Sequence, residues 1–190
     1  LTSTTVTSSQ TVKYTWVVSY NANGGSGAPG NQTKYGGSNL TLSSTKPTRT
    51  GYTFLGWNTS SSATTSSYAP GAIYNTNANL TLYAVWQVNK YYLDVNGYLD
   101  GSSKGNTTGY GTFDVYINGT QVVNDVSDFY QQIAYGSTYE IKDIKSSTGK
   151  TYAGVYQGSL TGTIGAETKA VSLKFNTSAL YLFNNGTVYG

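Results

Sequence analysis

The chain has 190 residues, which is enough for one large domain or two small ones. Only 10% of them are charged, the formal net charge is +3, and cysteine, histidine and methionine are absent. These absences exclude a disulfide framework, a Ser-His-Asp triad and an ordinary zinc or haem site. The apolar runs fall well short of the roughly 18 residues that a membrane span needs, and an aromatic share of 14% is atypical of a disordered chain.

Charge is distributed unevenly along the sequence. All the acidic residues lie between Asp94 and Glu167, so none precedes Asp94. This change in composition predicts a boundary near residue 88 between two modules with different surfaces. The lysines are dispersed and no recognition helix is predicted, so the sequence argues against nucleic-acid binding.

Most of the chain alternates β-branched or aromatic residues with serine, threonine or asparagine, which is the pattern of β-strands. In chain order, the clearest runs are Thr15–Tyr20, Leu80–Trp86, Thr112–Ile117, Thr138–Ile144 and Ala170–Phe175. Asn118-Gly119 predicts a two-residue hairpin turn, because both residue types tolerate a positive φ. Asp125–Gln132 is the single candidate for a helix and is equally compatible with a loop. The sequence therefore predicts an all-β (mostly β) protein built from tandem small domains.

The first residues of the chain repeat a pattern found further along. Val6–Trp16 aligns with Thr76–Trp86, so that Trp16 falls on Trp86 at the close of an alternating strand. This self-similarity predicts that residues 1–14 are the end of a preceding unit of the same type. A linker rich in serine and threonine is the alternative interpretation.

An ordered set of motifs follows between residues 15 and 87. Tyr20–Gly27 reads YNANGGSG, Lys46–Trp57 reads KPTRTGYTFLGW, Tyr68–Gly71 reads YAPG and Leu80–Trp86 reads LTLYAVW. In this order the motifs closely resemble the Listeria–Bacteroides repeat, the B-repeat module of internalin-type surface proteins. The resemblance implies a small β-grasp-like module over residues 15–87, of a type that occurs in tandem on bacterial surface proteins and also in phage tail proteins. It implies no catalytic residue.

Large aromatic side chains supply the apolar bulk that so short a module needs to close a core. The predicted core aromatics are Trp16, Tyr52, Phe54, Trp57 and Trp86. For Trp57 and Trp86 a sugar-binding platform is the alternative, and a place in the core or at its edge is the favoured interpretation.

Residues 88–177 carry no motif set that points to a family, and they are predicted to form a second β domain, β-sandwich-like or another small grasp. Asp94–Gly101 places side-chain oxygens at the first and third positions of a calcium loop, but Leu99 stands where that loop needs glycine. The segment is interpreted as a pair of turns, and neither a metal site nor a cofactor is expected. Residues 178–190 are predicted to begin a following segment.

The acidic residues give no support for catalysis. Hydrolysis of a glycosidic bond needs two carboxyl groups roughly 5 to 10 Å apart, and no predicted cleft brings two acids together. Glu140 and Lys142 share one face of a predicted strand, with Asp143 on the other face. The chain is therefore predicted not to be an enzyme. One covalent possibility is a Lys–Asn or Lys–Asp isopeptide crosslink between strands, assisted by a buried acid, and ordinary exposed lysines are the favoured interpretation.

Tyrosine is abundant in the second module and forms the candidate ligand surface. Its members are Tyr91, Tyr92, Tyr110, Tyr130, Tyr135, Tyr152 and Tyr156. Exposed tyrosine beside asparagine and aspartate is typical of adaptable recognition surfaces, and carbohydrate is the class of ligand that such a surface would hold. Pairing of tyrosines across neighbouring strands, which stabilises a sheet with few aliphatic residues, is the favoured alternative.

Three functions are consistent with these features. The first is a non-catalytic structural and adhesion protein, an excerpt of a tandem β-module array that is extracellular or on the bacterial cell surface. The second is a phage virion component (tail, fibre or capsid decoration) with a role in assembly or receptor binding, and the third is a carbohydrate-binding module. The expected partners are other modules of the same chain and cell-wall or host glycans. Homo-oligomer or virion assembly is a further option, and neither nucleic acid nor a membrane span is expected.

Overall fold

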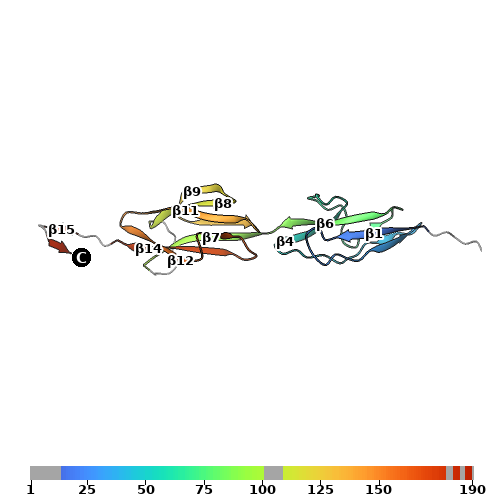
Figure 1. Cartoon of the computed structure of the whole chain (residues 1–190), viewed down its shortest axis with the longest axis horizontal. Coiled ribbons are helices and arrows are strands. Elements are labelled where there is room, and N and C mark those ends of the chain that lie inside the picture. Colours follow the sequence, from blue (N-terminus) through green and yellow to red (C-terminus); the bar gives the residue numbers. More distant parts are fainter. Residues whose placement is uncertain (1–13, 101–108, 179–181, 185–186, 190) are drawn as a thin grey trace, which may run out of the picture. The chain divides into compact units, whose positions relative to one another are not determined.

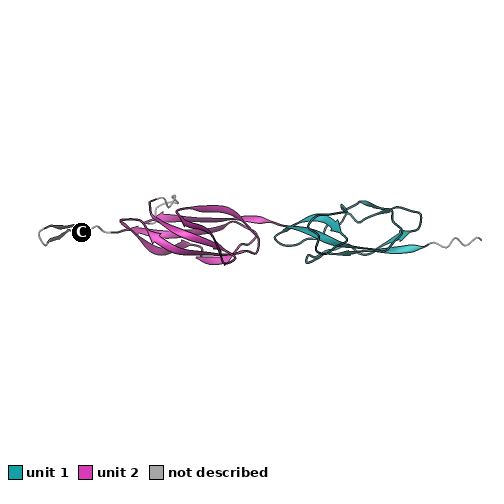
Figure 2. Ribbon diagram, turned by 90° about the horizontal axis from the view of Figure 1, so that it is seen from above, with its two compact units in different colours: residues 1–87 teal, residues 88–190 magenta. Residues whose placement is uncertain are grey.

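The computed structural model describes residues 14–100, 109–178, 182–184 and 187–189. The chain divides into two compact units, Leu1–Gln87 and Val88–Gly190 (Figure 2). All the regular structure of the described residues is strand, so the prediction of an all-β chain is confirmed. Residues 1–13, where the sequence predicts the end of a preceding repeat, lie outside the described residues. In the described part of the chain, no helix is long and apolar enough to cross a membrane.

One four-stranded sheet and one small two-stranded sheet form the first unit (Figure 1). The larger sheet has the order β2 (Gln32–Tyr35), β1 (Thr15–Asn21), β6 (Leu80–Val88), β4 (Tyr52–Asn58), and the smaller one joins β3 (Leu40–Thr41) to β5 (Ile73–Tyr74). Strand β1 runs antiparallel to β2 and parallel to β6. Two of the strands predicted from the sequence are thus the central strands of this sheet.

No helix packs on this sheet within the described residues, although a β-grasp fold carries one. The connection from β2 to β4 contains β3 and turns instead. Its sequence, GGSNLTLSSTKPTRTG over residues 36–51, is rich in glycine, serine, threonine and proline, which are weak helix formers. The structure therefore establishes a mixed β-sheet for this unit but does not establish a β-grasp fold.

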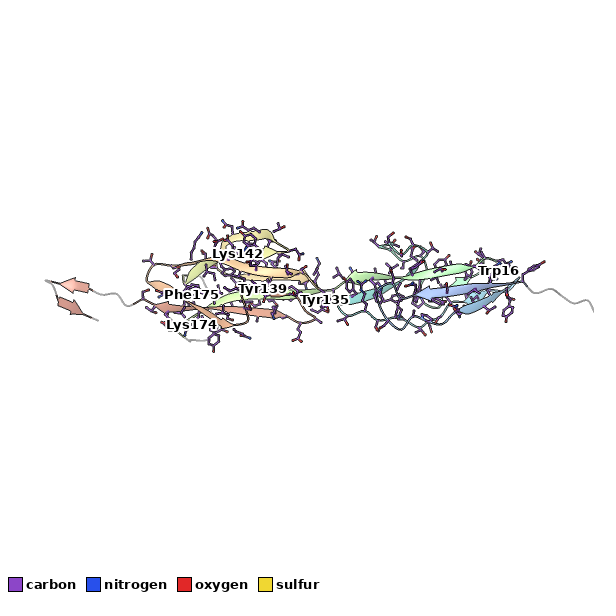
Figure 3. All side chains as sticks on the ribbon, in the orientation of Figure 1. Trp16, Tyr135, Tyr139, Lys142, Lys174 and Phe175 are labelled. Carbon is purple, nitrogen blue, oxygen red and sulfur yellow. The ribbon has the colours of Figure 1, made fainter. Side chains whose placement is uncertain are left out.

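Two four-stranded sheets form the main part of the second unit and lie in two layers (Figure 1). The β7 sheet has the order β10 (Phe129–Ala134), β7 (Lys90–Leu99), β14 (Lys169–Thr177), β12 (Lys150–Gln157), and the β8 sheet has the order β13 (Thr161–Thr163), β11 (Thr138–Ser146), β8 (Gly111–Ile117), β9 (Thr120–Val126). Both sheets contribute to one buried core, to which Tyr139 and Phe175 belong. Lys142 and Lys174 lie on the outer faces of the two sheets (Figure 3).

The structure corrects two local predictions in the second unit. Asp94–Gly101, interpreted as a pair of turns, lies mostly in β7, which continues to Leu99. Asp125–Gln132 is neither a helix nor a single loop, because it contains the end of β9, a short turn and the start of β10. In both places pairing with neighbouring strands overrides the turn-forming tendency of aspartate, asparagine and glycine.

Two hairpins lie where the sequence predicts a turn and a following segment. Strands β8 and β9 join through Asn118-Gly119, whose φ angles are 49° and 77°, as predicted for a two-residue turn. Near the end of the sequence, β15 (Leu182–Asn184) pairs antiparallel with β16 (Thr187–Tyr189), inside the stretch predicted to begin a following segment.

Candidate ligand surface

Stacked tyrosine pairs mark the outer face of the β7 sheet, which is the face turned away from the core. Tyr92 on β7 and Tyr130 on β10 stack with ring centroids 4.3 Å apart and planes 8° from parallel. Tyr98 on β7 and Tyr156 on β12 stack at 4.8 Å and 25°. Because β14 lies between β7 and β12, this second pair meets above β14. Tyr130 and Tyr156 are 53% and 57% exposed, so each stack presents one accessible ring.

The other four tyrosines of the candidate ligand surface do not join this face. Tyr110 and Tyr152 pack against Phe175 of the core, with ring centroids 6.5 and 5.7 Å away. Burial raises the pKa of the Tyr152 hydroxyl. Tyr91 and Tyr135 meet edge to face at 6.3 Å, and Tyr91 borders the core. The seven tyrosines therefore divide into three on the outer face and four with packing roles.

Sequence reasoning missed Tyr98 as a member of this face. The reason is that Asn96-Gly97 has the composition of a turn, which would end the strand before Tyr98. An even spacing separates Tyr98 from Tyr92, and residues at even spacings share one face of a strand. That spacing is the signal in the sequence that could have found it.

A chain of polar side chains lies between the two tyrosine stacks. Asn96 donates from Nδ2 to Asp94 Oδ1 at 2.9 Å, and Ser172 on β14 donates from Oγ to Asn96 Oδ1 at 3.2 Å. Their exposed fractions are small: 9% for Asp94, 3% for Asn96 and 2% for Ser172. Buried polar groups need such partners, and here the partners stand on two adjacent strands. The bonds therefore reinforce the pairing of β7 with β14.

The outer face of the β8 sheet holds an open hollow of about 380 Å³, lined by Tyr116, Thr138, Glu140, Thr161 and Thr163 among others. Lys142 Nζ lies 2.8 Å from a Glu140 carboxylate oxygen and 4.8 Å from the centroid of the Tyr116 ring. The hydrogen bond from Lys142 to Glu140 raises the pKa of Lys142. This face thus combines an aromatic ring, hydroxyl groups and a neutralised ion pair.

The carboxylates of the second unit mostly accept hydrogen bonds from nearby groups. Asp114 is buried and accepts from the Asp125 backbone N–H and from Gln121 Nε2, each at 2.8 Å. Asp125 accepts from Lys145 Nζ at 2.6 Å, and this bond lowers the pKa of Asp125. Over residues 14–100 and 109–178, no group of three or more Asp, Glu, Cys or His side chains is arranged to hold a metal ion.

In the first unit, Trp57 lies at the centre of the core and is fully buried. Tyr20 and Phe54 contact its ring edge to face, each with centroids 5.0 Å away, and Phe54 meets Trp86 at 5.5 Å. Trp86 donates from Nε1 to the Ala22 carbonyl at 3.0 Å. Trp57 is thus inaccessible to a sugar, and Trp86 is engaged with its own chain.

Cations cover the two remaining predicted core aromatics, which lie half-buried at the margin of the unit. The Arg49 guanidinium stands 3.8 Å from the centroid of the Tyr52 ring, and Lys34 Nζ stands 5.9 Å from that of Trp16. Contacts of this kind use the negative face of the aromatic ring.

Lys34 is itself buried, with 1% of its surface exposed, although the first unit contains no acidic residue. Its Nζ donates to the Tyr35 carbonyl and to Asn77 Oδ1, both at 2.9 Å. The structure thus pairs one lysine with one asparagine carboxamide. The isopeptide reaction that the sequence allows relies on a neighbouring buried acid, which this unit lacks. The pair is accordingly a hydrogen bond that ties β2 to the residues before β6.

The motif set of the first unit matches a known family. The model of the Listeria-Bacteroides repeat domain matches residues 16–85. This segment is a Listeria-Bacteroides repeat domain. No curated protein matches the chain.

Two solved structures are similar to the chain at low identity. One is GBS52, the minor pilin of the Gram-positive pathogen Streptococcus agalactiae, with 12% identity, a TM-score of 0.32 and coverage of 60% of this chain and 56% of the pilin. The other is the pilus-presented adhesin Spy0125 (Cpa), with 10% identity, a TM-score of 0.29 and coverage of 60% and 33%. The chain thus spans little more than half of the first protein and a third of the second.

Two motif glycines of the Listeria-Bacteroides repeat domain stand where a side chain would clash. A Cβ on Gly56, whose φ is 135°, would lie 2.7 Å from Ser66 Cβ and 2.9 Å from the Tyr68 carbonyl oxygen. A Cβ on Gly25 would lie 2.6 Å from Trp86 Cζ2. Real Cβ atoms do not approach other atoms so closely, so these positions require glycine. The YNANGGSG motif, through Gly25, and the KPTRTGYTFLGW motif, through Gly56, therefore each allow a close contact within the unit.

Proposed function

We propose that the chain is a non-catalytic structural and adhesive part of a tandem β-module array outside a bacterial cell, on its surface. The observation that carries this proposal is the Listeria-Bacteroides repeat domain at residues 16–85. The division of the chain into two compact units, each with its own buried core, supports it. A low content of charge and a tyrosine-rich outer face suit a module that is exposed to other surfaces.

The finer fold assignment belongs to the same proposal. The first unit is a β-grasp-like module without the helix, because its first and last long strands form a parallel pair at the centre of a mixed sheet. The second unit is a β-sandwich-like domain, because residues of both its sheets share one core. An experimental structure of the chain tests both assignments.

Surface display on the bacterium that encodes the chain is the direct test. Antibodies raised against the purified chain are expected to label intact cells, and brief treatment of those cells with protease should remove the signal. An antibody against a cytoplasmic protein of the same cells is the control for lysis. Labelling of lysed cells alone would contradict the proposal. Co-purification of the chain with phage particles would replace it with the virion alternative.

Glycan binding is the second candidate function, and the exposed tyrosine rings on the β7 sheet favour it. Tyr130 and Tyr156 each present a ring that is more than half exposed on the same face of one sheet. Flat apolar rings fit the C–H faces of sugars, while tyrosine hydroxyls supply hydrogen bonds. Cell-wall or host glycans are the partners proposed for this face.

A glycan array probed with the purified chain tests this second candidate. Tyr130→Ala and Tyr156→Ala are expected to weaken binding to any glycan that the chain retains. Tyr35→Ala is the matched control, because Tyr35 is a 52% exposed tyrosine in the other unit. Equal binding by all three variants would show that the ligand does not bind at the β7 sheet. An absence of binding across a broad array would contradict glycan binding as a function.

A further inference from the structure

In both units the first and the last strand of the main fold are parallel, hydrogen-bonded neighbours (Figure 1). In the repeat domain, β1 pairs with β6 from Val18 opposite Leu80 to Asn21 opposite Tyr83. In the second unit, the longer pair of β7 and β14 runs from Leu93 opposite Lys169 to Leu99 opposite Phe175. Parallel strands point the same way, so the chain enters each pair at one end and leaves it at the other.

Side-chain hydrogen bonds reinforce the β1–β6 pair. At its start, the Val17 backbone N–H donates to Asn79 Oδ1 at 2.8 Å. In the middle, Ser19 donates from Oγ to Thr81 Oγ1 at 3.1 Å. Towards its end, Trp86 on β6 donates to the Ala22 carbonyl just beyond β1. The two strands are therefore joined by side chains as well as by their backbone bonds.

The β7–β14 pair has side-chain bonds at corresponding places. In its middle, Ser172 donates to Asn96 within the buried polar chain described above. At its end, the Asp100 backbone N–H donates to the Phe175 carbonyl at 2.9 Å. The Asp100 carboxylate accepts from the Thr177 backbone N–H at 2.9 Å and from the Thr177 hydroxyl. Asp100 thus fastens the last residues of β14 to the end of β7.

The direction of a pull decides how such a pair resists it. Hydrogen bonds between parallel strands are evenly spaced along the pair and run at a slant from one strand to the other. A pull on the start of the first strand and the end of the last slides the strands past one another and loads all the bonds together. A pull on the same end of both strands opens the bonds one after another. Forced unfolding follows the height of the unfolding barrier, so the loading direction sets the resistance.

We infer that each unit is a shear clamp, a module built to carry tension along the chain. The connection between the clamps is short, because β6 ends at Val88 and β7 begins at Lys90, with Asn89 alone between them. Tension in one clamp strand therefore passes to the next with little slack. This inference deepens the proposed function and rests on it for its setting, an array through which tension passes.

Single-molecule force spectroscopy on the full chain tests the inference in the second unit. The chain has no cysteine, so a pair of introduced cysteines gives unique attachment points. Lys90→Cys with Ser178→Cys loads β7 and β14 in shear. Lys90→Cys with Thr168→Cys loads the same two strands from one end, since Thr168 precedes β14. Neither pair replaces a side chain that bonds across the clamp.

We expect the rupture force in the shear arrangement to be several-fold higher than in the one-ended arrangement at equal loading rate. Complete unfolding between the shear attachments should release roughly 300 Å of chain, which identifies the event. Denaturant unfolding of both double variants serves as the control for an intact fold. Equal rupture forces in the two arrangements would overturn the inference.

A second measurement tests the part played by the side chains. Asp100→Ala should lower the shear rupture force, whereas Asp128→Ala, an exposed aspartate in the turn before β10, should leave it unchanged. Equal forces in the two variants would remove Asp100 from the clamp. These readings on purified protein are independent of cell labelling. Failure of surface display would therefore contradict the proposed function but not the shear clamp. Equal rupture forces would contradict the shear clamp but not the proposed function.

Discussion

The two units of this chain close their cores in different ways. The repeat domain has one main sheet, and its core depends on a few large rings around Trp57 together with the segments that cover them. The second unit faces two sheets against each other and fills the space with residues such as Leu93, Val95 and Leu173. A single aromatic residue buries about 150–250 Å². A one-sheet unit therefore concentrates its stability in few residues, and a two-sheet unit spreads it over many.

The units also differ in how they use charge. The repeat domain contains a buried lysine and no acidic residue, and that lysine bonds to neutral oxygens. The second unit contains all the acidic residues, and several of them accept bonds from the backbone or from lysine. A fall in pH should therefore reduce the stability of the second unit and leave the stability of the first unit unchanged. Because all three tryptophans (Trp16, Trp57 and Trp86) lie in the first unit, tryptophan fluorescence reports that unit alone.

The largest effect is expected from Trp57→Ala. It removes the fully buried ring that Tyr20 and Phe54 contact, and replacements of this kind cost about 3–5 kcal/mol. Denaturant unfolding followed by the remaining tryptophans measures the loss. Tyr35→Ala, which shortens a half-exposed side chain of the same unit, should change little. Similar losses in the two variants would contradict a core centred on Trp57.

Leu173→Ala is the matching change in the second unit. The side chain is fully buried on β14, and such a replacement costs about 2–5 kcal/mol, depending on how far the site collapses. Hydrogen exchange of β7 and β14 measures the loss of stability. The midpoint of the unfolding transition that tryptophan fluorescence reports should not change. Val155→Ala, at an exposed position on neighbouring β12, is the control. A shift of the tryptophan transition would show that the two units do not unfold independently.

Much of the strand pattern could be predicted from the sequence, because alternation of side chains is a local property. The strand predicted at Thr15–Tyr20 corresponds to β1, and the Asn118-Gly119 turn joins β8 to β9. The turn predicted at Asn96-Gly97 is wrong, because the conformation of these residues depends on strands that are distant in the sequence. These residues lie in β7, whose neighbours β10 and β14 come from distant parts of the chain. Strand pairing there outweighs the turn preference of the dipeptide.

The sequence predicts which residue type forms the candidate ligand surface, but it does not predict which of these residues lie on one face. Abundant tyrosine pointed to the second unit, yet only the fold separates Tyr130, which lies outside, from Tyr152, which packs on the core. Lys34 shows the same limit. Nothing near it in the sequence predicts burial, since its partner Asn77 is far along the chain.

Lys34→Met should have a smaller effect, a loss of about 1–3 kcal/mol from the repeat domain. The change keeps an apolar stem of similar length but leaves the Tyr35 carbonyl and the Asn77 carboxamide without their donor, which carries a desolvation cost. Tryptophan fluorescence during denaturant unfolding measures it, with the exposed Lys46→Met as control. Unchanged or increased stability would show that burying the amine costs as much as its bonds contribute.

The smallest effect is expected from acid, and it should be confined to the second unit. Hydrogen bonds from the Thr177 side chain and backbone lower the pKa of Asp100 below its ordinary value of 3.8, and the bond from Lys145 does the same for Asp125. A group with a lowered pKa in the folded state stabilises that state above the unfolded pKa, and the contribution is lost as the pH falls through the folded value.

The second unit should therefore lose stability as the pH falls below about 4, while the repeat domain, which has no carboxyl side chain, should not. Thermal unfolding from neutral pH into this acid range measures both units. Tryptophan fluorescence gives the transition of the first unit, and the remaining transition in the circular dichroism of the chain is that of the second unit. Asp100→Asn should reduce the acid loss, because the residue at this position then no longer titrates. If the tryptophan transition moved with acid as far as the remaining transition, the units would be coupled. The contrast in charge would then not explain their stability.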